Sequence, residues 1–130
     1  MKKQALLLFL LPMVAALFSG FKPATQTLGT TACKWFVPNV FSPNDDGTND
    51  TFLPYSDCEL SVLSYEMRIF NRWGRLVFET KSIDEGWNGK ARGEDLPAGV
   101  YAYYIRYSTT SGNDLETETE VLSGDVAIIR

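Results

Sequence analysis

The sequence has 130 residues, a formal net charge of −4 at pH 7 and no histidine. The acidic balance argues against binding nucleic acid or anionic lipid through a basic face, because such binding needs clustered lysine and arginine side chains. The absence of histidine removes the commonest general base and makes a zinc site improbable. We therefore expect a protein that acts through its surface and is not an enzyme.

Residues 1–24 have the pattern of a secretory signal peptide. Lys2 and Lys3 form a positive start, and residues 5–18 follow as an apolar stretch. That stretch has about 14 residues, which is shorter than the roughly 20 residues that a membrane-spanning helix needs. Cleavage of the signal peptide would leave no transmembrane span in the mature chain. The removed residues 1–24 include three lysines and no acidic residue. The alternative is an uncleaved signal anchor.

Residues 25–33 are predicted to be a flexible leader, because they are mostly small and polar. We expect a single folded domain over residues 34–130, a length that suits one sandwich and leaves no room for a second domain.

Cys33 and Cys58 are the two cysteines of the sequence. An even number of cysteines in an exported chain favours a disulfide, because compartments outside the cytoplasm are oxidising. The alternative is a pair of free buried thiols.

The first strand signals are residues 35–37 and 40–41, which are separated by Pro38. Because proline lacks a backbone N–H, this segment is expected at a sheet edge or at a crossing between two sheets. Residues 65–71 and 75–80 follow as two alternating strands, joined through Asn71, Arg72, Trp73 and Gly74 in a β-hairpin.

Residues 100–109 and 122–130 are the last two predicted strands. In the first of them Tyr101, Tyr103, Ile105 and Tyr107 fall on one face, as expected for a half-buried strand. No stretch holds apolar residues at helical spacing over a full amphipathic helix. The sequence therefore predicts an all-β fold with two sheets around one core.

Residues 42–50 form an oxygen-rich loop around Gly47, and hard cations prefer oxygen ligands. The loop is not an EF-hand, because Ser42 and Leu53 stand where that motif has its first and last acidic ligands. A looser calcium site remains as a hypothesis, and no other cofactor is expected. We favour the alternative of a turn in which Asn and Asp side chains bond the local backbone and Gly47 has a positive φ. The hypothetical calcium ligands are Asp45, Asp46, Asn49 and Asp50.

Trp73 and Trp87 both stand next to glycines in predicted turns. Exposed tryptophans in the loops of a secreted sandwich can stack on sugars, which would make the domain a carbohydrate-binding module. We favour the alternative that each indole plugs an end of the sandwich and donates its N–H to a backbone carbonyl.

Six motifs follow one another in a set order along the chain. They are VPNVFSPNDDGTNDTF at 37–52, IFNRWG at 69–74, VFE at 77–79, GWNG at 86–89, LPAGVYAY at 96–103 and GDVAIIR at 124–130. In this order they resemble the gliding-motility-associated C-terminal domain, which is the type B sorting domain of the type IX secretion system. The resemblance covers residues 35–130.

The resemblance implies an immunoglobulin-like two-sheet β-sandwich of about seven strands. It also implies an exported module of Bacteroidota that the outer-membrane translocon recognises, with a final location at the cell surface or outside the cell. Because the family pattern reaches the last residue, we expect recognition to involve the final strand, at Gly124, Val126, Ile128, Ile129 and Arg130.

Only the expected signal peptide and leader precede the domain, so we expect the sorting domain to be both the export signal and the main folded part of the protein. The alternative function is a surface adhesive or carbohydrate-binding module whose partners are cell-surface proteins or glycans. A further alternative is a fragment of a split gene whose cargo is encoded elsewhere or lost.

Overall fold

The computed structural model describes residues 33–58, 61–110 and 117–130. The expected signal peptide (1–24) and all of the expected leader except Cys33 lie outside the described residues. The described part of the chain contains nine β-strands and no α-helix. None of its segments is therefore a helix long and apolar enough to cross a membrane.

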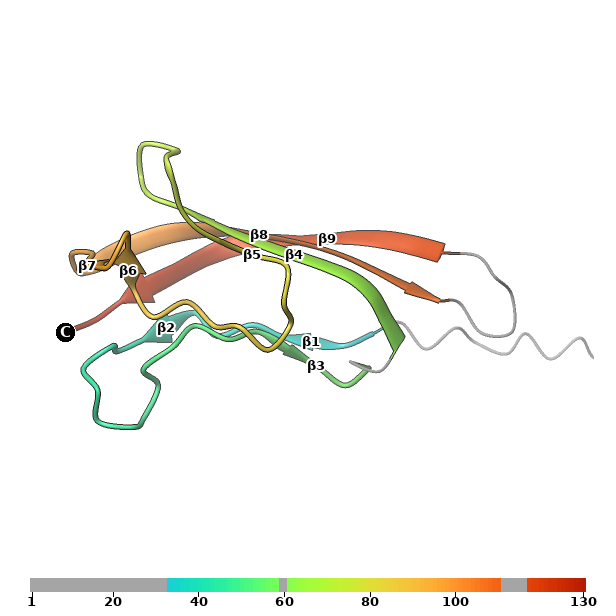
Figure 1. Cartoon of the computed structure of the whole chain (residues 1–130), viewed down its shortest axis with the longest axis horizontal. Coiled ribbons are helices and arrows are strands. Elements are labelled where there is room, and N and C mark those ends of the chain that lie inside the picture. The colour runs from blue at the N-terminus through green and yellow to red at the C-terminus, as the bar shows by residue number, and fades with distance from the viewer. Residues whose placement is uncertain (1–32, 59–60, 111–116) are drawn as a thin grey trace, which may run out of the picture.

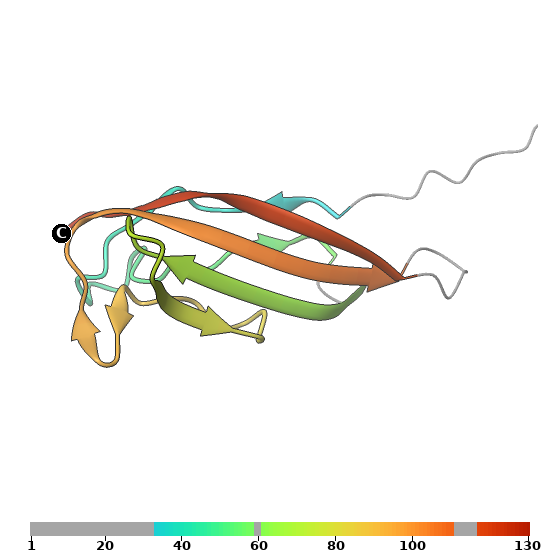
Figure 2. The same cartoon turned by 90° about the horizontal axis from the view of Figure 1, so that it is seen from above.

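Five strands form the main sheet, in the order β2, β9, β8, β4, β5. They are β2 (Val40–Phe41), β9 (Thr117–Ile128), β8 (Gly99–Thr110), β4 (Val62–Phe70) and β5 (Leu76–Thr80). β2 pairs with β9 in parallel, and all other pairs are antiparallel. Figure 2 shows the four longer strands side by side.

The remaining strands are short and form two small sheets. β1 (Trp35–Phe36) pairs with β3 (Tyr55–Ser56), and β6 (Lys90–Ala91) pairs with β7 (Glu94–Asp95). In Figure 1, β1 and β3 lie below the main sheet. Because β1 and β2 belong to different sheets, the chain crosses between layers at Pro38, as predicted.

The fold is therefore an all-β sandwich, which confirms the predicted fold class. Its described residues form nine strands where about seven were expected. The unpredicted strands β3, β6 and β7 have two residues each, which is too short for an alternating pattern to identify them.

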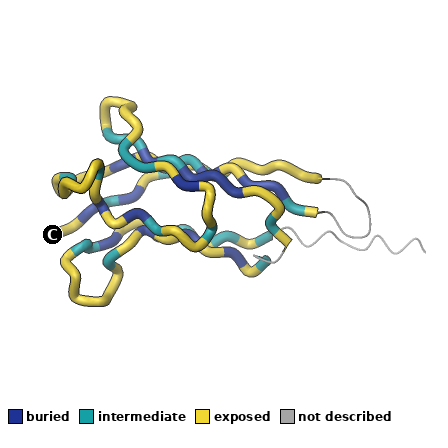
Figure 3. The backbone as a smooth tube through the Cα atoms, viewed as in Figure 1, coloured by how far each residue is buried: buried dark blue, intermediate teal, exposed yellow. Residues whose placement is uncertain are grey.

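The core lies between the layers and follows the alternation of β4 and β8. Successive side chains of a strand point to opposite faces, so Tyr65, Met67 and Ile69 of β4 share one buried face with Tyr101, Ile105 and Tyr107 of β8. Figure 3 shows buried positions along strands of both layers. The buried apolar residues are Phe41, Phe52, Tyr65, Met67, Ile69, Trp87, Tyr101, Ile105, Tyr107, Val126 and Ile128.

The outer face of the main sheet carries a network of charges instead. Glu66 is buried, and its carboxylate pairs with Arg68 at 2.6 Å and with Arg106 at 3.2 Å. Arg68 also contacts Glu79 on β5 at 3.1 Å. The buried carboxylate is therefore neutralised by two cations, Arg68 on its own strand β4 and Arg106 on the neighbouring strand β8.

A disulfide joins Cys33 to Cys58, as predicted, with a Cα–Cα distance of 5.6 Å. It links the chain just before β1 to the chain just after β3, across a sequence separation of 25 residues. In the chain-entropy model, closing such a loop stabilises the fold by roughly 3 kcal/mol.

Two strands begin earlier than predicted. β4 begins at Val62 and β9 at Thr117, where residues 65 and 122 were expected. The early part of β9 alternates threonine and glutamate and has no apolar signal, but β8 pairs with it from Thr110↔Thr117 onward. Backbone pairing with β8 therefore sets the start of this strand.

Candidate functional site

Segments that are far apart in the sequence gather at one end of the sandwich. We call this the C-terminal end and define it by the 42–50 loop, the 71–75 turn, the 96–101 segment and residues 129–130. In Figure 1 the loop, the turn and the C-terminus all lie at the same end of the molecule. Figure 3 shows that the 42–50 loop and the 71–75 turn are mainly exposed.

Arg130 ties two of these segments together. Its guanidinium donates to the carbonyl of Pro43 at 3.1 Å and to the carbonyl of Leu96 at 3.1 Å. It also pairs with Asp95 at 3.3 Å. The last residue of the chain is therefore a clamp between the loop after β2 and the segment before β8.

Three of the five residues predicted for recognition on the final strand face the interior. Val126 and Ile128 are buried in the core. Gly124 lies under the ring of Tyr103, and a Cβ added there would stand 2.6 Å from the tyrosine oxygen. A folded domain can therefore present only Ile129, which is 55% exposed, and part of Arg130 to a partner.

The 42–50 loop is organised around the carboxylate of Asp50. Its two oxygens accept hydrogen bonds from the backbone N–H groups of Asn44 (3.1 Å), Asp45 (2.8 Å) and Gly47 (2.7 Å). Gly47 has a φ of 83°. The favoured interpretation of this loop as a self-bonded turn is confirmed.

The hydrogen bonds of the loop also set the charge state of Asp50. Desolvation raises the pKa of this carboxyl, but the backbone N–H groups of Gly47, Asn44, Asp45 and Asp46 together outweigh it and hold the pKa below its usual value. The Asp50 carboxylate is thus an anion that already accepts hydrogen bonds from the backbone of its own loop.

The calcium hypothesis for Asp45, Asp46, Asn49 and Asp50 stays a prediction. Among the described residues, no three acidic, cysteine or histidine side chains lie close enough to hold one metal ion. Asp45 and Asn49 have left-handed backbones, with φ of 61° and 53°, and the side chain of Asp46 accepts the N–H of Thr48. The residues fit a rigid acidic turn.

The 71–75 turn joins β4 to β5, as the sequence predicted. The side-chain oxygen of Asn71 accepts the backbone N–H groups of Trp73 and Arg75, each at 3.0 Å. Gly74 closes the turn with a φ of 74°. These bonds fix the turn locally, so its side chains are displayed on a stiff support.

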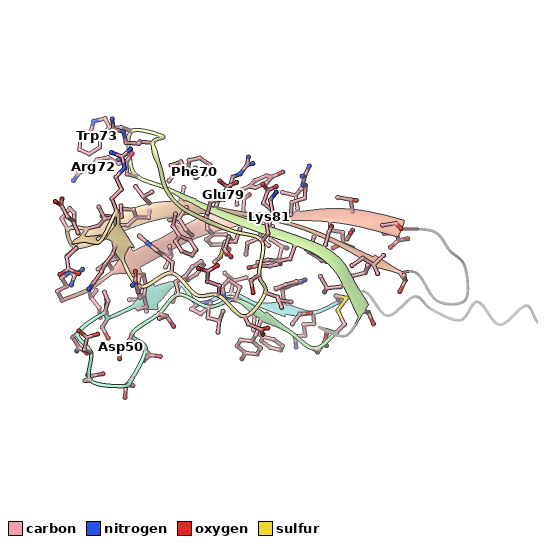
Figure 4. The ribbon with its side chains drawn as sticks, in the orientation of Figure 1. Asp50, Phe70, Arg72, Trp73, Glu79 and Lys81 are labelled. Atoms are coloured by element: carbon pink, nitrogen blue, oxygen red, sulfur yellow. A yellow bond between two sulfur atoms is a disulfide. The ribbon has the colours of Figure 1, made fainter. Side chains whose placement is uncertain are left out.

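Trp73 is 77% exposed, so the interpretation that it plugs the end of the sandwich is wrong. The guanidinium of Arg72 lies over its ring, 4.6 Å from the centroid. Figure 4 shows both side chains at the tip of the turn, directed away from the core. An aromatic ring held by a cation and open to solvent can contact a partner, and the proposal that it stacks on sugars stays a prediction.

Trp87 has the opposite environment. It is fully buried, and its Nε1–H donates to the carbonyl of Lys90 at 3.0 Å. Its ring lies against Phe41 and Tyr101, with centroid distances of 5.4 Å and 5.1 Å. The interpretation that this indole plugs the interior is confirmed, and Trp87 has no open face on which a sugar can stack.

A groove of about 400 Å³ runs between the 71–75 turn and the 96–101 segment. The 71–75 turn lines one side with Asn71, Arg72 and Trp73. The 96–101 segment lines the other side with Leu96, Pro97, Ala98, Gly99, Val100 and Tyr101. The hydroxyl of Tyr101 donates to the carbonyl of Pro97 at 2.8 Å and holds that segment in place.

Two arginines lie near Tyr101 in this groove, and one of them, Arg130, is paired with Asp95. Desolvation raises the pKa of Tyr101, and the guanidinium groups of Arg72 and Arg130 act in the opposite direction on the same phenol. Two cations therefore lie near one point of an otherwise acidic protein.

The sequence analysis did not identify Arg72 or the 96–101 segment as part of a site. The one available signal was composition, since an arginine beside a tryptophan in a turn is a combination that is enriched in protein interfaces. The pairing of that turn with the 96–101 segment depends on the sheet order and has no sequence signal.

Comparison with known proteins identifies one family. The model of the CHU_C Type IX secretion signal domain matches residues 35–121, about two thirds of the chain. A search of curated proteins finds no match. The matched range contains the β1–β3 pair, the 42–50 loop, the 71–75 turn and the groove, but not Cys33 of the disulfide or residues 122–130.

Proposed function

We propose a function from the premise that this chain belongs to the CHU_C type IX secretion signal domain family. The protein is a non-enzymatic exported module, and the translocon of the type IX system recognises it through the C-terminal end of the sandwich. Residues 1–24 act as the signal peptide for the inner membrane, residues 25–33 as the leader, and residues 34–130 as the sorting domain. Its final location is the cell surface or the medium.

One observation carries this proposal. Several of the motifs behind the resemblance meet at one end of the sandwich, although up to about ninety residues separate them in the sequence. Arg130 joins two of these segments there, because it donates hydrogen bonds to the carbonyls of Pro43 and Leu96. A translocon can recognise a folded domain only through exposed residues. This end has two exposed apolar side chains, Trp73 at 77% and Ile129 at 55%. Exposed tryptophan and arginine are residue types that dominate binding energy in interfaces.

The first test is fractionation of the native host, in a wild-type strain and in a strain lacking the type IX translocon, with mass spectrometry of the protein's termini. We expect an intact mature chain outside the wild-type cell and in the periplasm of the mutant. Retention in the periplasm of both strains would contradict the proposed function.

Point substitutions test the surface better than truncation. Removing residues 122–130 would delete Val126 and Ile128 from the core, so loss of export would follow from unfolding alone. We expect Ile129→Asp and Trp73→Ala to reduce export while the protein stays folded. Val121→Asp is the matched control, because Val121 is 51% exposed on the same sheet but lies outside the C-terminal end.

A second candidate function is a carbohydrate-binding surface at Trp73, supported by the exposure of its ring. It predicts binding of the purified protein to a glycan array that is lost in Trp73→Ala. Trp87 takes no part in it, because its ring is buried.

A further inference from the structure

The start of β8 has backbone groups that face away from β9. The N–H of Ala127 donates to the carbonyl of Asn39 at 2.9 Å, so the backbone groups of Ala127 point toward β2. The residue opposite Ala127 on β8 is Val100. In an antiparallel pair, residues that do not hydrogen-bond to each other direct their N–H and C=O to the opposite sides. Val100 therefore directs both groups toward the β4 side of β8.

β4 ends before it can pair with these groups. Its last pair with β8 is Phe70↔Ala102, and the N–H of Asn71 then donates to the carbonyl of Arg75 at 2.9 Å, which closes the turn. Figure 1 shows this turn rising away from the main sheet near the start of β8. In the described part of the chain, no strand lies beside Val100 on this side, and its N–H and C=O open into the groove.

The side chains around this open position combine an apolar surface with a cation. Val100 is 60% exposed, and Trp73 is 77% exposed on the opposite wall. Arg72 stacks on Trp73, and within the described residues its guanidinium makes no ion pair with a carboxylate. A carboxylate of a partner would therefore meet an arginine that is already positioned and not already neutralised.

We infer that the groove binds an extended peptide segment of a partner protein by strand addition at Val100, with an apolar side chain against Trp73 and a carboxylate on Arg72. The inference rests on the proposed function for the identity of the partner, which would be a translocon component, and it specifies the chemistry of that partner's segment. Unpaired strand groups give affinity to a peptide backbone, and the side-chain wall selects the sequence.

A glycan is the less favoured occupant. A sugar can stack on Trp73, but it has no repeating N–H and C=O groups to match those of Val100. The decisive observation is therefore the open backbone position rather than the exposed ring.

The test uses the full mature chain isolated from its host and three synthetic probes. The first is acetyl-Val-Glu-Val-Thr-Val-amide, which carries one carboxylate. The second has glutamine in place of glutamate, and the third has N-methylated backbone amides. We expect the first probe to change the fluorescence of Trp73 and to shift the amide N–H resonance of Val100 in NMR spectra, and we expect the N-methylated probe to do neither.

Substitutions then separate the contributions of charge and ring. We expect Arg72→Glu to weaken binding of the glutamate probe by roughly tenfold or more, because a charge-assisted hydrogen bond is lost, and to leave the glutamine probe much less affected. Lys81→Glu is the matched control: it makes the same charge change on an exposed lysine that Figure 4 places well away from Trp73. Equal weakening by both variants would contradict the inference.

Three further results would overturn the inference. The first is the absence of any shift at Val100 with all three probes. The second is equal binding of the N-methylated probe, and the third is binding of neutral and uronic oligosaccharides in place of the peptides, since backbone pairing would then play no role.

Export of the same variants distinguishes this inference from the proposed function. If Arg72→Glu loses the glutamate probe but is exported normally, the groove binds peptides and the proposed recognition surface is wrong. If Arg72→Glu and Trp73→Ala are retained in the periplasm and no probe binds, the proposed function stands and strand addition is wrong.

Discussion

Two segments of this protein place a tryptophan next to a glycine, in opposite order, and the two tryptophans have opposite environments. Trp73 precedes Gly74 and is 77% exposed, whereas Trp87 follows Gly86 and is fully buried. Trp73 and Gly74 lie in a turn that rises from the main sheet, whereas Trp87 pairs with Phe52 in an isolated β-bridge. A tryptophan beside a glycine thus predicted the turn at Trp73 correctly, but the predicted turn at Trp87 is wrong, because Trp87 lies in a β-bridge. Pairing with a distant segment therefore decides whether the indole is core or surface.

The two glycines also differ in why they are needed. Gly74 has a φ of 74° and open space where a Cβ would lie. Gly86 is crowded instead, because a Cβ there would stand 3.2 Å from the Cβ of Thr51, the Cβ of Leu53 and the carbonyl of Phe52. Gly74 allows a left-handed backbone conformation, and Gly86 allows its own segment to approach residues 51–53 closely.

The largest expected effect is that of Trp87→Ala. We expect a loss of about 3–5 kcal/mol in the free energy of unfolding, because the change leaves a large cavity and an unpaired carbonyl at Lys90. Urea unfolding followed by circular dichroism measures it. A loss below about 1 kcal/mol would mean that the indole is not part of the core.

Gly86→Ala is expected to come second. The added methyl meets a backbone carbonyl that cannot move without breaking the Phe52–Trp87 bridge, so we expect a loss of about 1–3 kcal/mol. The midpoint of thermal unfolding should fall accordingly. Wild-type stability of this variant would show that residues 51–53 can shift.

Gly74→Ala tests the conformational explanation alone, since nothing crowds the added methyl. An L-residue in the left-handed region costs about 1–2 kcal/mol, and we expect a loss in that range. Gly74→Asn should recover part of it, because asparagine tolerates this region better. Equal losses for alanine and asparagine would contradict a backbone cause.

Trp73→Ala is expected to have the smallest effect on stability, within about 0.5 kcal/mol, because the ring buries little surface. The same substitution should have a large effect on export, which fractionation of the host measures. If the Trp73→Ala protein is stable and normally exported, the exposed Trp73 has no role in export.

Alternation along single strands made the core of the main sheet predictable. Tyr65, Met67 and Ile69 on β4, and Tyr101, Ile105 and Tyr107 on β8, are buried together as their spacing predicted. The order of motifs predicted the family, which the match over residues 35–121 confirms. The cysteine count predicted the disulfide, since only one pairing of two cysteines exists.

The site was much less predictable, as the final strand illustrates. Its apolar residues suggested a recognition segment, yet Val126 and Ile128 are core residues because β9 pairs with β8 and β2 along its last residues. Arg72 and Val100 are 28 positions apart in the sequence, and no local pattern connects them. They meet because β4 stops two residues short of pairing with Val100.

The sequence by itself determined the all-β class, the alternating faces, the self-bonded 42–50 loop and the 71–75 turn, because each depends on residues within a few positions of one another. Only the tertiary structure decided which tryptophan is exposed, which residues of β9 face the core and where the groove opens. Those outcomes depend on sheet order and on where a strand ends, which are set by pairings between distant segments. A one-residue shift in such a pairing would exchange the buried and exposed faces without any change in sequence.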